Sequence, residues 1–424
     1  MDKNTFALTP PMGWNSYDYY NTSTDEKAMR ENAEYIAKNL KEFGWEYVVV
    51  DIQWYSKHDR IKMEEYQYIP FEEVRMDEYS RLLPCLERFP SAEGDNGFKP
   101  LADYIHSLGL KFGIHIMRGI PRIAAHTHTA IKGTSVTADI IADPTSICFW
   151  NPDMYGVRPN KPESQLYYDS LMELYAAWGV DFIKCDDICR MDAPSAREEI
   201  RMLQEAIQKS GRPMVLSLSP GNAKIEQAWW YEKYSNMWRI TDDFWDNWKS
   251  LYNMFERCEV WEKHVTAGNY PDCDMLPLGK LGGYHFGEFE CRFNKEEQKT
   301  MMTLWSIFKS PMMIGAELTM MDDWTLSLLT NREILSMLKF TAQAKQLERT
   351  KKRAVWTNVS DDGVRYIALF NLSDEDCDME FSLNELSATY TKGMDLWSGE
   401  AVEVKNNTLV KKIPAHGVFA VKVC

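Results

Sequence analysis

The sequence predicts an α/β fold in which a large parallel sheet is wrapped by helices and followed by a small antiparallel β domain. Short apolar, β-rich segments alternate with longer helical patterns over most of the chain. Beyond about residue 340 the pattern changes to short β-type segments separated by Asn, Asp, Ser and Gly turns. A length of 424 residues with 45% hydrophobic content fits one large and one small domain. We place these domains at residues 1–340 and 341–424.

Six segments have the composition of strands in the larger domain: residues 47–51, 111–117, 181–186, 215–219, 238–243 and 311–318. Two intervening segments have clear helical limits. Residues 25–43 follow the cap-like Ser23 and Thr24 and end at Gly44, and residues 165–178 end at Gly179. This periodicity is equally typical of a closed barrel and of an open doubly wound sheet, so it does not choose between them.

The overall charge limits the classes of partner. There are 63 acidic and 48 basic residues, giving a net charge of −15, which disfavours nucleic acid and anionic membrane surfaces and favours neutral substrates. The sequence shows neither a secretory leader nor an apolar segment long enough to span a bilayer. Nine cysteines without a repeated spacing suit free thiols. We therefore expect a soluble, cytoplasmic protein.

Motifs for nucleotides and metals are missing from the sequence. It contains no GxGxxG and no GxxxxGK[ST], so no phosphate-binding loop is expected. His126 and His128 form an isolated His-x-His without the helical HExxH or paired cysteines typical of zinc sites. We expect neither a metal nor an organic cofactor.

Charged residues recur at the ends of the predicted strands. Asp51 ends VVVD, Lys184 and Asp186 end FIKCD, and Arg239 and Asp243 belong to WRITDD. In a barrel these ends meet on one face, where active sites are built. A single aspartate in such a place commonly caps the next helix, but several strands that end in this way favour a site.

Two carboxyl groups on opposite sides of a glycosidic bond can cleave it, one at the anomeric carbon and one at the leaving oxygen. Asp186 and Asp243 come from different strands and suit these two roles. Lys184 lies two residues before Asp186, so both side chains point to the same face and the cation would keep the carboxylate ionised. A purely structural ion pair is the alternative.

A series of motifs then carries a family resemblance. TPPMGWNS, GWEYVVVDIQWY, KFGIHIM, GVDFIKCDD, WRITDDFWDNW and PDCDML follow one another, and DLWSG and IPAHGV come near the end. In this order they resemble glycoside hydrolase family 27, which contains α-galactosidases, α-N-acetylgalactosaminidases and β-L-arabinopyranosidases. The resemblance spans nearly the whole chain. It implies a (β/α)8 TIM barrel followed by a C-terminal antiparallel β-sandwich.

The resemblance also implies a mechanism and a carbohydrate substrate. Asp186 matches the family's nucleophile and Asp243 its acid/base, so a double displacement with retained configuration is expected, without metal or cofactor. The matching sugar-binding and pocket-lining positions are Trp14, Asp51, Lys184, Arg239, Asp274 and Met275. Homo-oligomers are compatible with the resemblance, although the sequence identifies no surface for one.

The sequence departs from the family at Ile52, where the galactosidases have the second aspartate of a sugar-binding pair. Isoleucine cannot accept a hydrogen bond from a hydroxymethyl group. Burying that group without a partner would cost about 1–3 kcal/mol of binding free energy. β-L-Arabinopyranose is α-D-galactose without this group. Ile52 therefore favours β-L-arabinopyranosidase activity. The alternative is an α-galactosidase in which Ile52 is a repacked barrel residue and Asp51 still binds galactose.

Two further departures are Ser219 and His115. Ser219 matches the residue of the N-acetylgalactosaminidases, where a small side chain leaves room for an acetamido group, and His115 replaces a common tyrosine of the pocket. Two other classes stay open: a sugar-binding protein without activity, and a lyase that uses Lys184 as a Schiff base. Retention of both carboxylates argues against the first, and the order of the motifs argues against the second.

Overall fold

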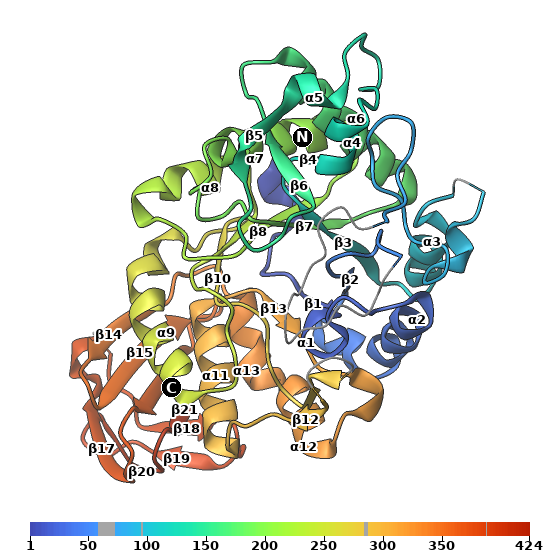
Figure 1. Cartoon of the computed structure of the whole chain (residues 1–424). Helices are drawn as coiled ribbons and strands as arrows, with labels where there is room; N and C mark the ends of the chain where they lie inside the picture. The colour runs from blue at the N-terminus through green and yellow to red at the C-terminus, as the bar shows by residue number, and fades with distance from the viewer. Residues whose placement is uncertain (58–72, 95, 284–286, 387) are drawn as a thin grey trace.

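The computed structural model describes residues 1–57, 73–94, 96–283, 287–386 and 388–424. Figure 1 shows helices arranged around a central set of strands, with the last strands of the chain forming a separate layer near the C-terminus.

Eight parallel strands form the central sheet and are hydrogen-bonded in their order along the chain. They are β1 (Met12–Asn15), β2 (Tyr47–Val50), β3 (Lys111–Met117), β7 (Phe182–Asp186), β8 (Val215–Leu218), β9 (Met237–Arg239), β10 (Tyr270–Asp272) and β13 (Met312–Ile314). Leu276, just after β10, bridges to Ile314 of β13 in parallel register. Its backbone N–H donates to the Met313 carbonyl, and its carbonyl accepts from Gly315. This bridge joins the two edges of the sheet, so the fold is the closed barrel and not the open alternative.

All six predicted strand segments overlap barrel strands. The prediction omitted β1 and β10, which have only four and three residues. β10 reads Tyr-Pro-Asp, and a proline inside a strand argues against a paired strand when only the sequence is considered.

The two predicted helices are present with small differences at their starts. α2 (Glu26–Tyr35) continues through a π-helical turn (Ile36–Leu40) and a 3-10 turn (Lys41–Phe43) to Gly44, whose φ of 105° ends it. Its N-cap is Asp25, which accepts a hydrogen bond from the Ala28 N–H. The prediction that Ser23 or Thr24 caps this helix was therefore wrong. α6 (Pro162–Trp178) begins three residues earlier than predicted and ends at Gly179 as expected.

The other helices that follow barrel strands, or lie between the barrel and the sandwich, are α3 (Lys99–Ser107), α7 (Ala196–Ser210), α8 (Ala228–Tyr234), α9 (Trp248–Trp261), α11 (Lys295–Phe308), α12 (Asp323–Leu329) and α13 (Arg332–Ser336). Short 3-10 turns are Lys3–Phe6, Pro90–Ala92, Ile225–Gln227, Glu262–His264, Leu318–Met320, Met337–Lys339 and Leu383–Leu386.

Among the described residues, two insertions after barrel strands contain short strands of their own. The larger follows β3 and contains an antiparallel sheet of β4 (Ile120–Pro121), β6 (Met154–Val157) and β5 (Ala142–Ile147), with the short helices α4 (Arg122–His126) and α5 (Ala138–Ile141). The smaller is the hairpin of β11 (Lys280–Leu281) and β12 (Phe289–Glu290). A one-turn helix, α1 (Tyr17–Tyr20), directly follows β1.

The C-terminal layer consists of two antiparallel sheets. The larger contains β14 (Lys345–Arg349), β15 (Arg353–Val359), β16 (Arg365–Asn371), β21 (Val418–Val423), β18 (Lys392–Asp395) and β19 (Ala401–Glu403). The smaller pairs β17 (Cys377–Ser382) with β20 (Thr408–Ile413). Apolar side chains of both sheets, among them Leu369, Phe381 and Leu409, form one buried cluster. The expected antiparallel β-sandwich is therefore present.

The barrel and the sandwich meet at His416. Its Nδ1 lies 2.7 Å from Glu297 on α11 and its Nε2 lies 2.9 Å from Asp374 in the sandwich. The imidazole also stacks on Trp248 of α9, with ring centroids 3.7 Å apart and planes 9° from parallel. One side chain thus joins two barrel helices to the sandwich.

All nine cysteines carry free thiols. No helix in the described part of the chain has the length and apolar character needed to cross a membrane.

We expect His416→Ala to lower the free energy of unfolding by about 1–3 kcal/mol, because it leaves Glu297 without this partner and removes the stacking on Trp248. Urea unfolding followed by tryptophan fluorescence measures the change. Lys405→Ala, at an exposed side chain of the same sandwich, is the control. Equal midpoints for the two variants would contradict this role of His416.

Candidate active site

A cavity of about 300 Å³ opens at the carboxyl ends of the barrel strands. Its described lining comes from segments that follow β1, β2, β7, β8, β9 and β10, together with the loop between β5 and β6. The lining residues are Tyr17, Asp18, Asp51, Ile52, Phe149, Trp150, Lys184, Asp186, Arg190, Pro220, Arg239, Asp242, Asp243, Phe244, Trp245, Asp274 and Met275. Its size lies at the lower end of the range for small-molecule sites.

Most of the residues that the sequence pointed to meet in this cavity. Eight of them line it: Asp51, Ile52, Lys184, Asp186, Arg239, Asp243, Asp274 and Met275. Three do not line it: Trp14, His115 and Ser219.

His115 lies behind the cavity wall, against Asp186. Its fully buried ring places Nε2 3.0 Å from Oδ2 of Asp186. Burial alone would raise the pKa of the Asp186 carboxyl, but the hydrogen bond from His115 and the charge of Lys184 outweigh it, so the pKa lies well below its ordinary value. Asp186 is therefore ionised at neutral pH. Since a carboxylate only accepts, Nε2 of His115 carries the proton.

Lys184 and Asp51 form a buried ion pair on the same side of the cavity. Nζ of Lys184 lies 2.8 Å from Oδ2 of Asp51, which also accepts a hydrogen bond from Asn15 at 2.7 Å. The backbone N–H of Ile52 donates to the other oxygen at 2.9 Å. Burial raises the pKa of Asp51, but Lys184 and His115 more than reverse this, and the net pKa is lowered. Asp51 is thus fixed as an acceptor of hydrogen bonds.

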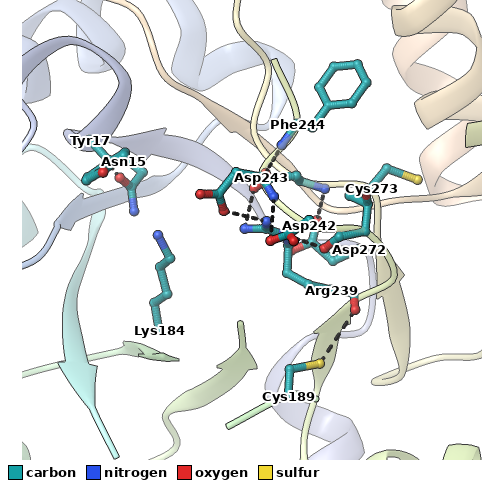
Figure 2. Close-up of polar contacts among 12 residues, drawn as sticks. Asn15, Tyr17, Lys184, Cys189, Arg239, Asp242, Asp243, Phe244, Asp272 and Cys273 are labelled. Atoms are coloured by element: carbon teal, nitrogen blue, oxygen red, sulfur yellow. Dashed lines mark hydrogen bonds and ion pairs between the residues drawn. The ribbon is translucent and has the colours of Figure 1, made fainter. Parts of the chain in front are cut away.

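Arg239 links two carboxylates on the opposite side. Its Nη2 lies 2.9 Å from Asp243 and its Nη1 lies 2.8 Å from Asp274. Figure 2 shows Asp243 and Asp272 close to Arg239, with Lys184 and Asn15 apart from this group. The Arg239 side chain is 4% exposed, whereas that of Asp243 is 64% exposed. Asp243 therefore reaches from a fixed base toward the opening of the cavity.

Asp274 is held in an unusual backbone conformation, with φ at 79°. Three contacts maintain it: its N–H donates to Asp272, its Oδ2 accepts from the Phe244 N–H at 2.7 Å, and its carbonyl accepts from Trp305. Strained residues of this kind persist when their surroundings fix them and are frequent at functional sites. The result is a carboxylate aimed at Arg239.

Trp14 and Ser219 do not line the cavity. The Trp14 indole is fully buried and donates to the Ala316 carbonyl at 2.7 Å. Ser219 lines a small void of about 20 Å³ under Lys184 and Arg239 instead of the main cavity. Ser219 is thus close to Lys184 and Arg239 but outside the main cavity.

Several lining residues could not be identified from the sequence. Asp18 is the most unusual, because its side chain is buried and its Oδ2 has no hydrogen-bond partner among the described residues. Burial raises its pKa well above the ordinary value, and the nearby Asp274 adds to this effect. Asp18 could not be recognised from the sequence, because an acid in a first helical turn usually stabilises the helix terminus. Phe149 and Arg190 come from loops far apart in the sequence.

The arrangement suits chemistry at a neutral polyol. Two carboxyl groups with different surroundings, Asp186 and Asp243, belong to one cavity that also holds fixed donors and acceptors. The described residues include no cluster of three or more His, Cys, Asp or Glu side chains that could hold a metal ion.

Comparison with known families matches nearly the whole chain. Residues 9–157 and 155–339 match the model described as alpha galactosidase A, and residues 350–423 match the alpha galactosidase C-terminal beta sandwich domain. An alpha-galactosidase from Cyamopsis tetragonoloba is 25% identical over 98% of this chain and 86% of its own length.

Solved structures give higher identities. A family 27 β-L-arabinopyranosidase from Geobacillus stearothermophilus, crystallised with arabinose, is 50% identical, covers 100% of this chain and 99% of its own, and superposes with a TM-score of 0.95. A putative alpha-N-acetylgalactosaminidase from Bacillus halodurans is 48% identical over 98% of this chain and 97% of its own, with a TM-score of 0.87. With its barrel, its sandwich and both family models matched, the chain belongs to the alpha galactosidase A family, glycoside hydrolase family 27, and is a glycoside hydrolase.

Proposed function

We propose that this glycoside hydrolase releases terminal β-L-arabinopyranosyl residues with retention of configuration. The observation that carries the proposal is Ile52 in the wall of the cavity, directly after the sugar-binding candidate Asp51. Its side chain is nearly fully buried and offers only an apolar surface. A sugar hydroxymethyl group against it would lose water without gaining a partner. The 50% identity to a β-L-arabinopyranosidase supports the same choice.

The proposed reaction is a double displacement. Asp186, kept ionised by His115 and Lys184, attacks the anomeric carbon while Asp243 protonates the leaving oxygen. Asp243 then deprotonates a water, which releases the sugar from Asp186. Arg239 forms ion pairs with both Asp243 and Asp274, so its charge does not stabilise the carboxylate of Asp243 alone.

Asp51 and Lys184 are proposed to bind sugar hydroxyls, and Asp18 to donate a hydrogen bond as a neutral acid. The cavity supports this assignment because all three residues line it and because the buried Oδ2 of Asp18 has no hydrogen-bond partner within the described residues. A protonated carboxyl group there supplies a donor without adding another negative charge.

An α-galactosidase is the second candidate, supported by relatives such as the Cyamopsis enzyme and by the presence of Asp51. An N-acetylgalactosaminidase is less well supported, because Ser219 lies under the cavity and not on its wall.

The wild type should hydrolyse 4-nitrophenyl β-L-arabinopyranoside with a higher kcat/KM than 4-nitrophenyl α-D-galactopyranoside. Asp186→Asn should lower kcat by about a thousandfold or more, because the amide is a poor nucleophile. NMR of the first-formed sugar measures the anomeric configuration. A tenfold preference for the galactoside would reject the arabinopyranoside assignment, and an inverted product would reject the double displacement.

Ile52→Asp should shift the kcat/KM ratio of galactoside to arabinopyranoside upward by about tenfold or more, because the carboxylate can accept from the hydroxymethyl group. Ile52→Leu is the matched control and should leave the ratio close to that of the wild type. The same ratio in all three proteins would mean that residue 52 does not contact this part of the sugar.

Asp18→Asn should raise the thermal midpoint at pH 7 more than at pH 4. The pKa of Asp18 is higher in the folded than in the unfolded protein, so the wild type loses stability as the pH rises above the ordinary carboxyl pKa of about 3.9. An amide does not titrate and avoids this loss. Differential scanning calorimetry at both pH values measures the effect, with Asp378→Asn in the sandwich as the exposed control. Equal shifts at the two pH values would contradict a raised pKa.

A further inference from the structure

A second cavity of about 270 Å³ adjoins the candidate active site. Phe149, Arg190 and Pro220 line both cavities, so the two are adjacent. Its other lining residues are Thr145, Ile147, Asp187, Ile188, Asp192, Ala193 and Pro194.

The second cavity lies close to the loop that carries Asp243. Asp243, the proposed acid, is next in the chain to Asp242, whose carboxylate forms an ion pair of 2.5 Å with Arg190. Arg190 stands between the two cavities and also donates to the Gly221 carbonyl. A group bonded to the oxygen that Asp243 protonates can reach the second cavity past Arg190 and Pro220, which line both cavities.

The charged side chains of the second cavity already have partners within the protein. Asp187 pairs with Arg118 at 2.8 Å, Asp192 pairs with Lys224 at 2.9 Å, and Arg190 pairs with Asp242. These ion pairs occupy groups that would otherwise bind the hydroxyls of a second sugar.

The remaining surface is apolar and exposed. The Phe149 side chain is 83% exposed and that of Ile147 is 47% exposed, and both lie at the β5–β6 hairpin beside Pro220 and Pro194. An exposed aromatic ring at the entrance of a polar sugar site can bind a flat apolar group, because the contact removes apolar surface of both from water.

Resting on the proposed function, we propose that the second cavity is an aglycone site that takes an aromatic or otherwise flat, apolar leaving group. Phe149 forms its main contact surface. The sugar site fixes the glycosyl unit, and the second cavity selects what that unit is attached to.

The test compares two substrates that share the glycosyl unit cleaved by the wild type. One is the 4-nitrophenyl glycoside, which reaches the second cavity, and the other is the glycosyl fluoride, whose leaving group is a single atom. Phe149→Ala should lower kcat/KM for the nitrophenyl glycoside by about tenfold, mainly through KM, and should lower kcat/KM for the fluoride at least fivefold less than this. Phe149→Leu should recover part of the loss. Leu8→Ala, at another exposed apolar side chain, is the control and should change neither substrate.

Three outcomes would overturn the aglycone site. Equal losses on both substrates would place the effect of Phe149 on the sugar, and no loss on either would remove it as a contact. A larger loss with a disaccharide substrate than with the nitrophenyl glycoside would make a second sugar the occupant. Failure of the wild type to cleave any of these substrates would instead reject the proposed function.

Discussion

The balance of charge within the cavity is the constraint on which the site depends. Its described lining contains six carboxyl groups but only three cations, Lys184, Arg190 and Arg239, so burial cannot leave every acid ionised at low energy. The cations are distributed unequally. Lys184 and His115 keep Asp51 and Asp186 ionised. Asp18 forms no ion pair among the described residues, and its pKa is raised. One cavity thereby holds two ionised carboxylates beside a cation and one carboxyl group whose pKa is raised.

Much of the fold could be predicted from the sequence because buried parallel strands are nearly continuous apolar segments. The segments at 47–51 and 111–117 have this property, and they correspond to β2 and β3. β1 and β10 do not, since β1 contains Gly13 and ends at Asn15, and β10 consists of Tyr270, Pro271 and Asp272. Periodicity alone also left the barrel and the open sheet equal. The contact between Leu276 and Ile314 decides this, and a single long-range hydrogen-bonded bridge leaves no local pattern.

Some residues of the candidate site could be predicted from the sequence, and others could not. Asp51, Asp186 and Arg239 could be predicted because each ends or follows a strand, and parallel strands bring those ends together. Asp18 and Phe149 could not, because one resembles an ordinary first-turn acid and the other lies in a hairpin inserted between β3 and α6. His115 was expected in the pocket, but its ring lies behind Asp186, where its hydrogen bond helps to lower the pKa of that carboxyl group.

The hairpin of β5 and β6 belongs to a small sheet that, in the described part of the chain, pairs only with β4 and not with any barrel strand (Figure 1). Its tip carries Phe149 over a barrel whose own hydrogen bonds are complete without it. An exchange of Phe149 would leave the closed ladder and the ion pair of Lys184 and Asp51 untouched, because neither involves this side chain. A lineage could therefore vary the compounds from which its enzyme removes a sugar while the chemistry beneath stays the same.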